Sequence, residues 1–209
     1  NFFRLMSLSD GQYIMFCDQD DVWEPNKIEL TLKRMKELEK EKGSSLPLLV
    51  FTDLRVVNEN LETIASSFER MSHLDCTRTQ LPRLLVQNVV TGCTAMMNAA
   101  LREIAVQAKD LSRVTMHDGW VALIASAFGA SAYLPVQTIC YRQHGDNSVG
   151  AKKTLSPSYV WDKLFVNNDL RASLSAMRLQ ALEFYDCYAD QMDDQTRVLV
   201  EEFCSQSSA

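Results

Sequence analysis

A short apolar run that ends in a cluster of carboxylates constrains this chain more than any other feature. Residues 13–17 are Tyr, Ile, Met, Phe and Cys, and the carboxylates that follow are Asp18, Asp20 and Asp21. A continuous apolar run of this length, preceded by an Asp-Gly turn, predicts a buried strand in a sheet that is covered on both faces. Its carboxyl end would lie at the rim of the sheet, where open α/β folds bind ligands.

The close spacing of these carboxylates predicts a metal site. Three neighbouring anions repel one another unless a cation joins them, and a hard divalent ion bound by oxygen ligands is the usual solution. The alternative is a purely structural role, because aspartate is a good helix N-cap and Pro25 suits the first turn of a following helix. One aspartate would be enough for a cap, so a metal site is the preferred interpretation.

The composition is that of a globular protein with no affinity for nucleic acid. The chain has 209 residues, 46% of them hydrophobic, which is enough for one domain with a helical appendage. The formal net charge is -6, and the sequence has no cluster of Lys and Arg to bind a phosphate backbone. The widely spaced cysteines include no C-x-x-C pair, which indicates a reducing, cytoplasmic compartment. No apolar stretch is long enough for a transmembrane segment, and peripheral association with a membrane is compatible with the sequence.

Apolar segments that alternate with amphipathic ones predict an α/β core over residues 1–150. Strands are predicted at 13–17, 48–57, 89–97 and 133–141, and amphipathic helices at 27–42, 98–108 and 118–128. A strand, a helix and a strand in this order imply a parallel pair with a right-handed crossover. We therefore expect the four strands to share one mixed sheet.

The remaining segments are a polar connection and a C-terminal extension. Residues 61–80 indicate a loop with a short helix, and a helix is predicted over 82–87. Residues 151–209 are assigned to a separate helical extension. Apolar residues step by three and four over 170–184, and a second helix is predicted over 198–203, so this extension should form an α-hairpin packed on the core.

Three features that are distant in sequence would form one site if the sheet is parallel. They are the acidic cluster, the His117-Asp118 pair at a predicted helix start, and His144 at the end of the last strand. The positive end of a helix dipole keeps Asp118 ionised, as a general base requires. Gly92 within a predicted strand suggests that the backbone approaches a ligand closely. The alternatives are an N-cap role for Asp118 and a solvated loop histidine.

Four segments resemble those of a known family in sequence, order and approximate spacing. They are residues 18–23 (DQDDVW), 90–94 (VTGCT), 117–120 (HDGW) and 141–150 (YRQHGDNSVG). The chain resembles the large inverting family of GT-A glycosyltransferases, in its rhamnosyltransferase-like branch, over nearly all of the predicted core. The resemblance implies a GT-A type mixed sheet flanked by helices, with the helical extension at the C-terminus. It also implies transfer of a sugar such as rhamnose from a nucleoside diphosphate donor to a glycan or lipid-linked acceptor, in the synthesis of surface polysaccharides.

The resemblance also implies roles for the residues on the donor side of the site. Asp18 is the first carboxylate of the D-x-D motif and binds the donor diphosphate. Asp20 contacts Mg²⁺ or Mn²⁺, Asp21 supports it, and His144 reaches the metal from the last strand.

On the acceptor side, the resemblance makes Asp118 the base that deprotonates the acceptor hydroxyl. Thr91, Gly92 and Cys93 correspond to the glycine loop near donor and acceptor, and Trp120 belongs to the motif of the base. Inversion is consistent with this division, because the base acts on one face of the sugar while the leaving diphosphate departs from the other.

Three basic residues follow or end the last predicted strand. Arg142, Lys152 and Lys153 would add positive charge over the diphosphate, although a solvated lysine pair is the common alternative. The chain begins just before the D-x-D strand, and the first strands of the family have no counterpart in it. We therefore expect an exposed sheet edge that favours self-association.

Two other functional classes fit parts of the sequence. The apolar strand followed by D-x-D-x-V also matches haloacid-dehalogenase-like phosphatases, but the later lysine and acidic motif of that class have no counterpart here. The other alternative is a non-catalytic protein that binds only a metal or a glycan.

Overall fold

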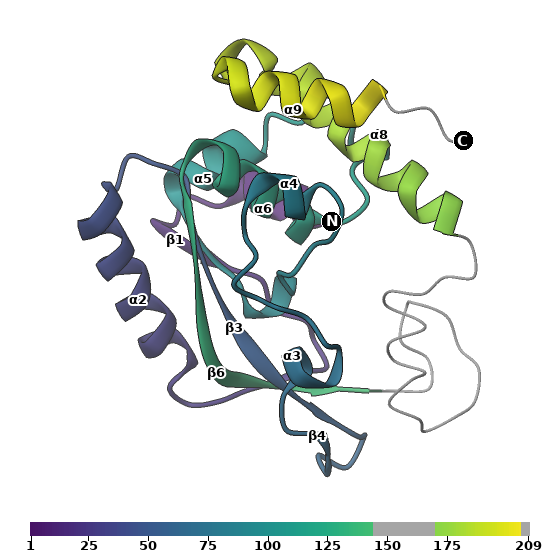
Figure 1. Cartoon of the computed structure of the whole chain (residues 1–209). Coiled ribbons are helices and arrows are strands. Elements are labelled where there is room, and N and C mark those ends of the chain that lie inside the picture. The colour runs from purple at the N-terminus through teal and green to yellow at the C-terminus, as the bar shows by residue number, and fades with distance from the viewer. Residues whose placement is uncertain (144–169, 206–209) are drawn as a thin grey trace.

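A mixed sheet forms the centre of the protein in the computed structural model of the chain (Figure 1). The structure describes residues 1–143 and 170–205. The strands of this part are β1 (Tyr13–Met15), β2 (Val22–Trp23), β3 (Leu48–Val57), β4 (Thr63–Ala65), β5 (Met96–Asn98) and β6 (Ala130–Arg142). Their order is β1-β5-β3-β6-β2, with β4 paired to β3 off this path. Only β3 and β6 pair in parallel, and the other described pairs are antiparallel.

Helices cover both faces of this sheet. They are α1 (Phe2–Leu8), α2 (Lys27–Lys42), α3 (Phe68–Met71), α4 (Leu81–Leu84), α5 (Ala99–Ala105), α6 (His117–Phe128), α8 (Leu170–Tyr188) and α9 (Asp194–Ser205). Short 3₁₀ turns lie at Gly92–Thr94, Leu111–Arg113 and Ala189–Gln191. The predicted fold class, a GT-A type mixed sheet flanked by helices, is confirmed.

Strand β3 divides the core into two layers. Leu48 and Val50 point to the layer that contains Met35 and Leu38 of α2. Leu49 and Phe51 point to the opposite, larger layer, which α4, α5, α6 and α8 complete. Alternate residues of a strand face opposite sides of a sheet, so a strand buried on both faces reads as a continuous apolar run. The prediction of a buried strand over 48–57 is confirmed.

Helix α2 has the predicted bounds, and one residue of its predicted apolar face is exposed. It ends at Gly43, whose φ of 102° lies in the left-handed region that favours glycine. Lys27 and Thr31 lie on the buried face, whereas Ile28 is 55% exposed. The spacing of Ile28, Met35 and Leu38 in the sequence predicts that they share the apolar face, which is correct for Met35 and Leu38 and wrong for Ile28.

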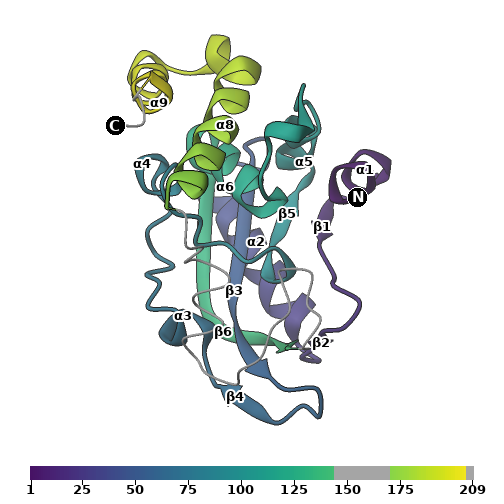
Figure 2. The ribbon, with the colours of Figure 1, turned by 90° about the vertical axis from the view of Figure 1, so that its right-hand side faces the viewer.

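Two of the predicted strands are shorter than expected. Residues 89–97 were predicted as one strand, but only 96–97 belong to β5, because the Gly92–Thr94 turn interrupts the run. Strand β1 ends at Met15 and is half-buried, since β5 is its only partner in the described sheet. Figure 2 shows β1 beside α1 at one edge of the molecule. The first strand and β3 run in the same direction, but β5 lies between them, so the predicted direct parallel pair was wrong.

Strand β6 is bent, and the bend brings its last residues to β2. Its register with β3 shifts between Thr52 and Asp53, where Leu134 and Gln137 are the successive partners. Pro135 lies in this gap and has no N–H to donate to the ladder. Beyond the bend β6 also pairs with β2 (Figure 2), and it ends at Arg142. The end of β6 is thereby placed beside the loop over residues 16–21 between β1 and β2, which carries the three carboxylates and is called the acidic loop below.

Helices α8 and α9 form the predicted α-hairpin, at the end of the molecule far from β4 (Figures 1 and 2). Phe184 and Tyr188 of α8 pack on Trp120 of α6, with ring centroids 6.0 and 5.8 Å from the indole. The division at residue 150 lies outside the described residues and stays a prediction. No helix of the described part is long and apolar enough to cross a membrane.

Asn98 joins α5 to the segment before β3. Its Oδ1 accepts hydrogen bonds from the amides of Leu101 and Leu48, both at 3.0 Å, and the first of these is the predicted helix cap. Its Nδ2 donates to the carbonyls of Leu46 at 2.8 Å and Ser44 at 3.3 Å. The side chain is buried, so water cannot replace these partners.

We expect Asn98→Ala to lower the free energy of unfolding by about 2 to 4 kcal/mol, because it removes a cap and leaves buried backbone groups without partners. Asn26→Ala is the matched control, since Asn26 is also an N-cap residue but makes no capping hydrogen bond. Its effect should stay within about 0.5 kcal/mol. Urea denaturation of the variants measures both values, and equal midpoints for the two variants would contradict the role of Asn98.

Candidate functional site

A cleft of about 640 Å³ brings together residues that are far apart in sequence. Asp18 comes from the loop after β1, Gly92 from the 3₁₀ turn, Asp118 from the first turn of α6 and Tyr141 from the end of β6. Helix α8 contributes a further wall, which includes Gln180. Clefts with a few convergent polar groups are the usual sites of ligand binding. Asp18 of the acidic cluster and the His117-Asp118 pair thus line one cleft. The predicted convergence of these residues with His144 stays a prediction, because His144 lies outside the described residues.

Asp18 and Asp21 form the acidic centre of this site. Their carboxylate oxygens and the Sγ atom of Cys93 all lie within 4.8 Å of one another. Oδ1 of Asp21 accepts a hydrogen bond from the backbone amide of Arg142 at 3.0 Å. Oδ2 of Asp21 is buried and has no hydrogen-bond partner in the described part of the chain.

The environment of Asp21 favours a bound cation. Burial raises its pKa to about 6, the Arg142 amide opposes the shift, and the negative charges of Asp18 and Asp20 add to it. A divalent cation would reverse this effect, because an opposite charge stabilises the ionised carboxylate. The unpartnered Oδ2 gives such an ion an oxygen ligand, as Mg²⁺ and Mn²⁺ prefer. The residues present therefore fit the predicted metal.

Cys93 and Asp20 lie near this centre but are less suited to bind the metal in the observed geometry. Burial raises the pKa of the Cys93 thiol well above its usual value, so the thiol stays neutral and is a poor ligand for a hard ion. The carboxylate of Asp20 is not a member of the group that Asp18 and Asp21 form. Its assignment as the principal metal ligand stays a prediction, and the geometry favours Asp21.

Arg142 fastens the acidic loop to the end of β6. Its Nε donates to the carbonyl of Asp20 at 3.0 Å, and its Nη1 donates to the carbonyl of Glu59 at 2.7 Å. Its backbone amide holds Asp21, as described above. The guanidinium thus fixes the position of the acidic loop, and its predicted contact with the donor diphosphate stays a prediction.

Asp118 is the second centre of the cleft, and it is only 7% exposed. Its carboxylate accepts hydrogen bonds from the amides of Gly92 at 3.1 Å and Gly119 at 2.6 Å, and from Nδ2 of Asn88 at 3.1 Å. Met116 is the N-cap of α6, so Asp118 lies within the first turn and the alternative N-cap role is excluded.

Burial decides the charge state of Asp118. It raises the pKa of the carboxyl to about 6, although the amide hydrogen bonds from Gly119 and Gly92 act in the opposite direction. The expectation that the helix terminus alone keeps Asp118 ionised therefore needs correction, because desolvation outweighs the hydrogen bonds. A carboxyl group with a pKa near the working pH suits general base catalysis.

The glycine at position 92 is required by the packing of His117. A Cβ atom at Gly92 would lie 2.5 Å from Nε2 of His117. The imidazole is stacked on Phe2 with ring centroids 3.8 Å apart and meets the edge of Phe16 at 4.6 Å. Burial lowers the pKa of His117 to about 4, so the ring is neutral and forms part of the cleft wall.

The remaining predicted residues are placed as follows. Thr91 and Cys93 line the cleft with Gly92. Trp120 does not, because its side chain is buried in the core and its Nε1 donates to the carbonyl of Ala105 at 3.0 Å. Its predicted place on the acceptor side is therefore corrected to a core residue. His144, Lys152 and Lys153 lie outside the described residues, and their roles stay predictions.

Helix α8 contributes two polar residues that the sequence did not reveal. Oε1 of Gln180 accepts hydrogen bonds from the amides of residues 115–116 at 3.0 and 3.4 Å. Oε1 of Glu183 accepts from the amides of residues 109–110 at 2.6 and 2.7 Å. These bonds hold the segment that leads into Asp118. The only signal in the sequence is that both residues share the inner face of a predicted amphipathic helix.

Lys27 is a third residue that the sequence analysis missed. It is the first residue of α2, is 1% exposed and donates a hydrogen bond to the carbonyl of Cys93. Its spacing of four from Thr31 and eight from Met35 places it on the buried face of the helix. That spacing was the available signal.

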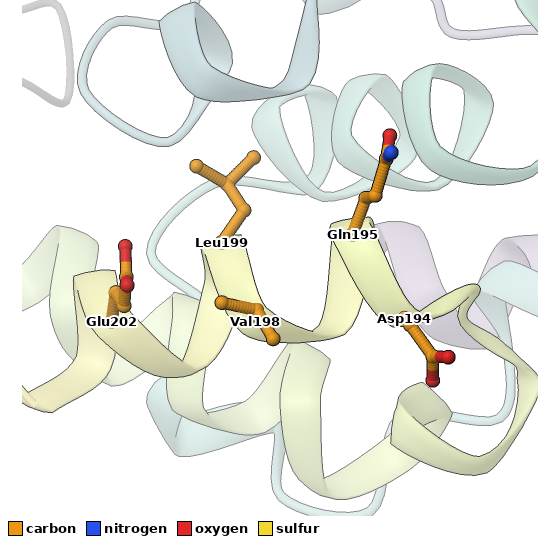
Figure 3. A pocket seen from close by; sticks show the side chains of 5 residues that line it. All are labelled: Asp194, Gln195, Val198, Leu199 and Glu202. Carbon is orange, nitrogen blue, oxygen red and sulfur yellow. The ribbon is translucent and has the colours of Figure 1, made fainter.

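A shallow hollow on α9 offers no comparable chemistry (Figure 3). Its lining side chains all come from that helix and are Asp194, Gln195, Val198, Leu199 and Glu202. Ligand sites usually combine polar groups from several elements. We therefore assign the functional site to the cleft.

Comparison with known proteins agrees with this assignment. The profile of Glycosyl transferase family 2 matches residues 1–104, which include the acidic loop and the 92–94 turn. The dTDP-rhamnosyl transferase RfbG of Shigella flexneri is 24% identical over 216 residues, which cover 88% of this chain and 70% of the relative. No solved structure matches the chain. The phosphatase alternative finds no support in these matches. The family match over residues 1–104 and the similarity to this relative identify the chain as a rhamnosyltransferase-like glycosyltransferase with a GT-A type fold.

Proposed function

We propose that the protein is a metal-dependent inverting glycosyltransferase that moves a sugar such as rhamnose from a nucleoside diphosphate to a hydroxyl of a glycan or lipid-linked acceptor. The observation that carries the proposal is the presence of two separate carboxylate centres in one cleft. Asp18 is grouped with Asp21, and Asp118 lies across the 92–94 turn from them. The similarity to the dTDP-rhamnosyl transferase of Shigella flexneri supports dTDP-rhamnose as the donor.

The acidic centre suits the donor side. Asp18 and Asp21 would hold Mg²⁺ or Mn²⁺, with Asp20 and His144 as further predicted ligands. Such an ion, when bound, neutralises the charge of the diphosphate leaving group. The unpartnered oxygen of Asp21 supports this role, because a buried carboxylate oxygen without a donor is costly unless a cation meets it.

Asp118 suits the acceptor side. Its carboxylate accepts the proton of the acceptor hydroxyl as the new bond to the sugar forms. The hydrogen bonds from Gly92, Gly119 and Asn88 fix its orientation, which is what a general base needs.

The apolar lining of the cleft supports an acceptor that has an apolar part. Beyond Asp118 the lining is largely apolar and includes Phe68, Leu74, Leu84, Leu85, Val89 and Met177. Apolar linings bind apolar surface because water is released on contact. A lipid-linked acceptor in surface polysaccharide synthesis fits this lining. The cytoplasmic location, peripheral membrane association and self-association through the β1 edge stay predictions.

The first prediction separates the two centres. Asp118→Asn should lower kcat about 10²- to 10⁴-fold, because an amide cannot accept the hydroxyl proton. Binding of dTDP with Mn²⁺, measured by calorimetry, should change less than about threefold, since the base acts only as the bond forms. Asp110→Asn is the control, because Asp110 is only partly buried, caps a 3₁₀ turn and does not line the cleft. Retention of more than a tenth of the wild-type kcat in Asp118→Asn would remove Asp118 from the role of base.

The second prediction concerns the metal. Asp21→Asn should weaken binding of Mn²⁺ at least about tenfold, because it replaces the unpartnered oxygen ligand. EDTA should abolish transfer, and added Mn²⁺ should restore it. Asp75→Asn, at an exposed loop carboxylate, is the control. Asp20→Asn tests the sequence-based assignment, and unchanged Mn²⁺ affinity in Asp21→Asn would contradict the geometric one.

The third prediction is a pH dependence. Asp118 must be ionised to accept a proton, and its pKa is raised to about 6, so kcat/KM should fall about tenfold per pH unit below pH 6 and level off above it. The assay uses saturating Mn²⁺, which keeps Asp21 ionised across this range. A flat profile between pH 5 and pH 7 would contradict the assignment of the base.

A further inference from the structure

We propose that Lys27 is a positioning residue that fixes the Gly92–Thr94 turn between the acidic centre and the base. The proposal rests on the glycosyl transfer proposed above and adds a residue to it. Lys27 touches neither centre directly but holds the backbone that separates them.

The surroundings of Lys27 are unusual for a lysine. Its Nζ donates hydrogen bonds to the carbonyl of Cys93 at 2.9 Å and to Oγ1 of Thr138 at 3.4 Å. The ammonium also lies 4.9 Å from the ring centroid of Trp23. Among the described residues, no carboxylate forms an ion pair with Lys27. Its direct partners are neutral oxygens and an aromatic ring, and the more distant negative charge of Asp21 partly opposes the lowering of its pKa by burial.

Stability alone does not explain a lysine at this position. Transfer of a charge from water into the interior is costly, and an apolar residue of similar volume is often as stable. Burial lowers the pKa of Lys27 to about 8, so the side chain still carries its charge at neutral pH. The charge also lies at the N-terminus of α2, where the helix dipole disfavours a cation. These costs point to a role in the site.

The carbonyl that Lys27 holds belongs to the turn that joins both centres. The Gly92 amide of this turn donates to Asp118 at 3.1 Å, and Sγ of Cys93 lies within 4.8 Å of the carboxylates of Asp18 and Asp21. One peptide turn is therefore held by the base on one side and by Lys27 on the other. A displacement of about 1 Å at such a point can cost about 10²-fold in rate.

Lys27 also connects the turn to rigid parts of the fold. Oγ1 of Thr138 on β6 lies 2.6 Å from Oγ1 of Thr52 on β3, and both threonines are buried. Trp23, on which the ammonium lies, comes two residues after Asp21 in the acidic loop. The contacts of one side chain thus reach β6, the 92–94 turn and β2, the strand that directly follows the acidic residues.

The test compares three variants of the full chain. Lys27→Met keeps the length of the side chain but removes its donors, and Lys27→Gln keeps a neutral donor. Lys33→Met is the matched control, because Lys33 is an exposed lysine of the same helix and lies outside the site. Steady-state kinetics with dTDP-rhamnose and Mn²⁺, together with urea denaturation, are measured for each.

We expect Lys27→Met to fold and to lower kcat about tenfold or more, with the KM of the donor changed less than about threefold, because the residue positions the base without touching the donor. Lys27→Gln should retain more kcat than Lys27→Met, and Lys33→Met should stay within about threefold of the wild type. A folded Lys27→Met with wild-type kcat would overturn the proposal. A loss of folding in both Lys27 variants would also overturn it, because the role would then be structural.

Asp118→Asn, assayed in parallel, separates this proposal from the proposed function. If Asp118→Asn is inactive and Lys27→Met is fully active, only the role of Lys27 fails. If Asp118→Asn retains wild-type transfer, the assignment of the base fails and the role of Lys27 fails with it.

Discussion

The hydrogen bond between the amide of Gly92 and the carboxylate of Asp118 is the interaction on which the site depends. It places a buried acid against a backbone turn that also borders the acidic loop. The turn can approach so closely only because residue 92 lacks a Cβ, which would meet His117 at 2.5 Å. Because His117 is stacked on Phe2, its imidazole cannot easily move aside, and residue 92 must therefore be glycine.

The rest of the fold stabilises the protein against the cost of burying ionisable groups in the site. Asp21 is a half-buried acid and Asp118 a buried one, and desolvation destabilises the ionised form of each, while Lys27 is a buried cation that makes no ion pair in the described part of the chain. Local sequence rules are commonly broken at functional sites and compensated elsewhere. Here the compensation comes from the doubly covered strand β3 and from α8, whose Gln180 and Glu183 hold the segment before Asp118.

The predictions from sequence were most accurate for the long helices and strands. Helix α2 and strands β3 and β6 are long and strongly patterned, and all three were predicted in type and position. The run over 89–97 was misassigned, because the Gly92 amide bonds to a side chain of α6 and not to a neighbouring strand. The direct pairing of the first strand with β3 was also wrong, since β5 lies between them. Pairing between distant segments has no local signature that a single sequence displays.

The sequence by itself determined the family, the fold class, the acidic loop, the glycine turn and Asp118, because motif residues and hydrophobic periodicity are local properties of the chain. Only the tertiary structure decided which groups are buried and what they meet. It grouped Asp21 with Asp18, moved Trp120 from the acceptor side into the core and placed Lys27 under the turn. The physical reason is that desolvation and hydrogen-bond partners depend on segments that are a hundred or so positions apart, such as Lys27 and Thr138, and folding alone brings these together.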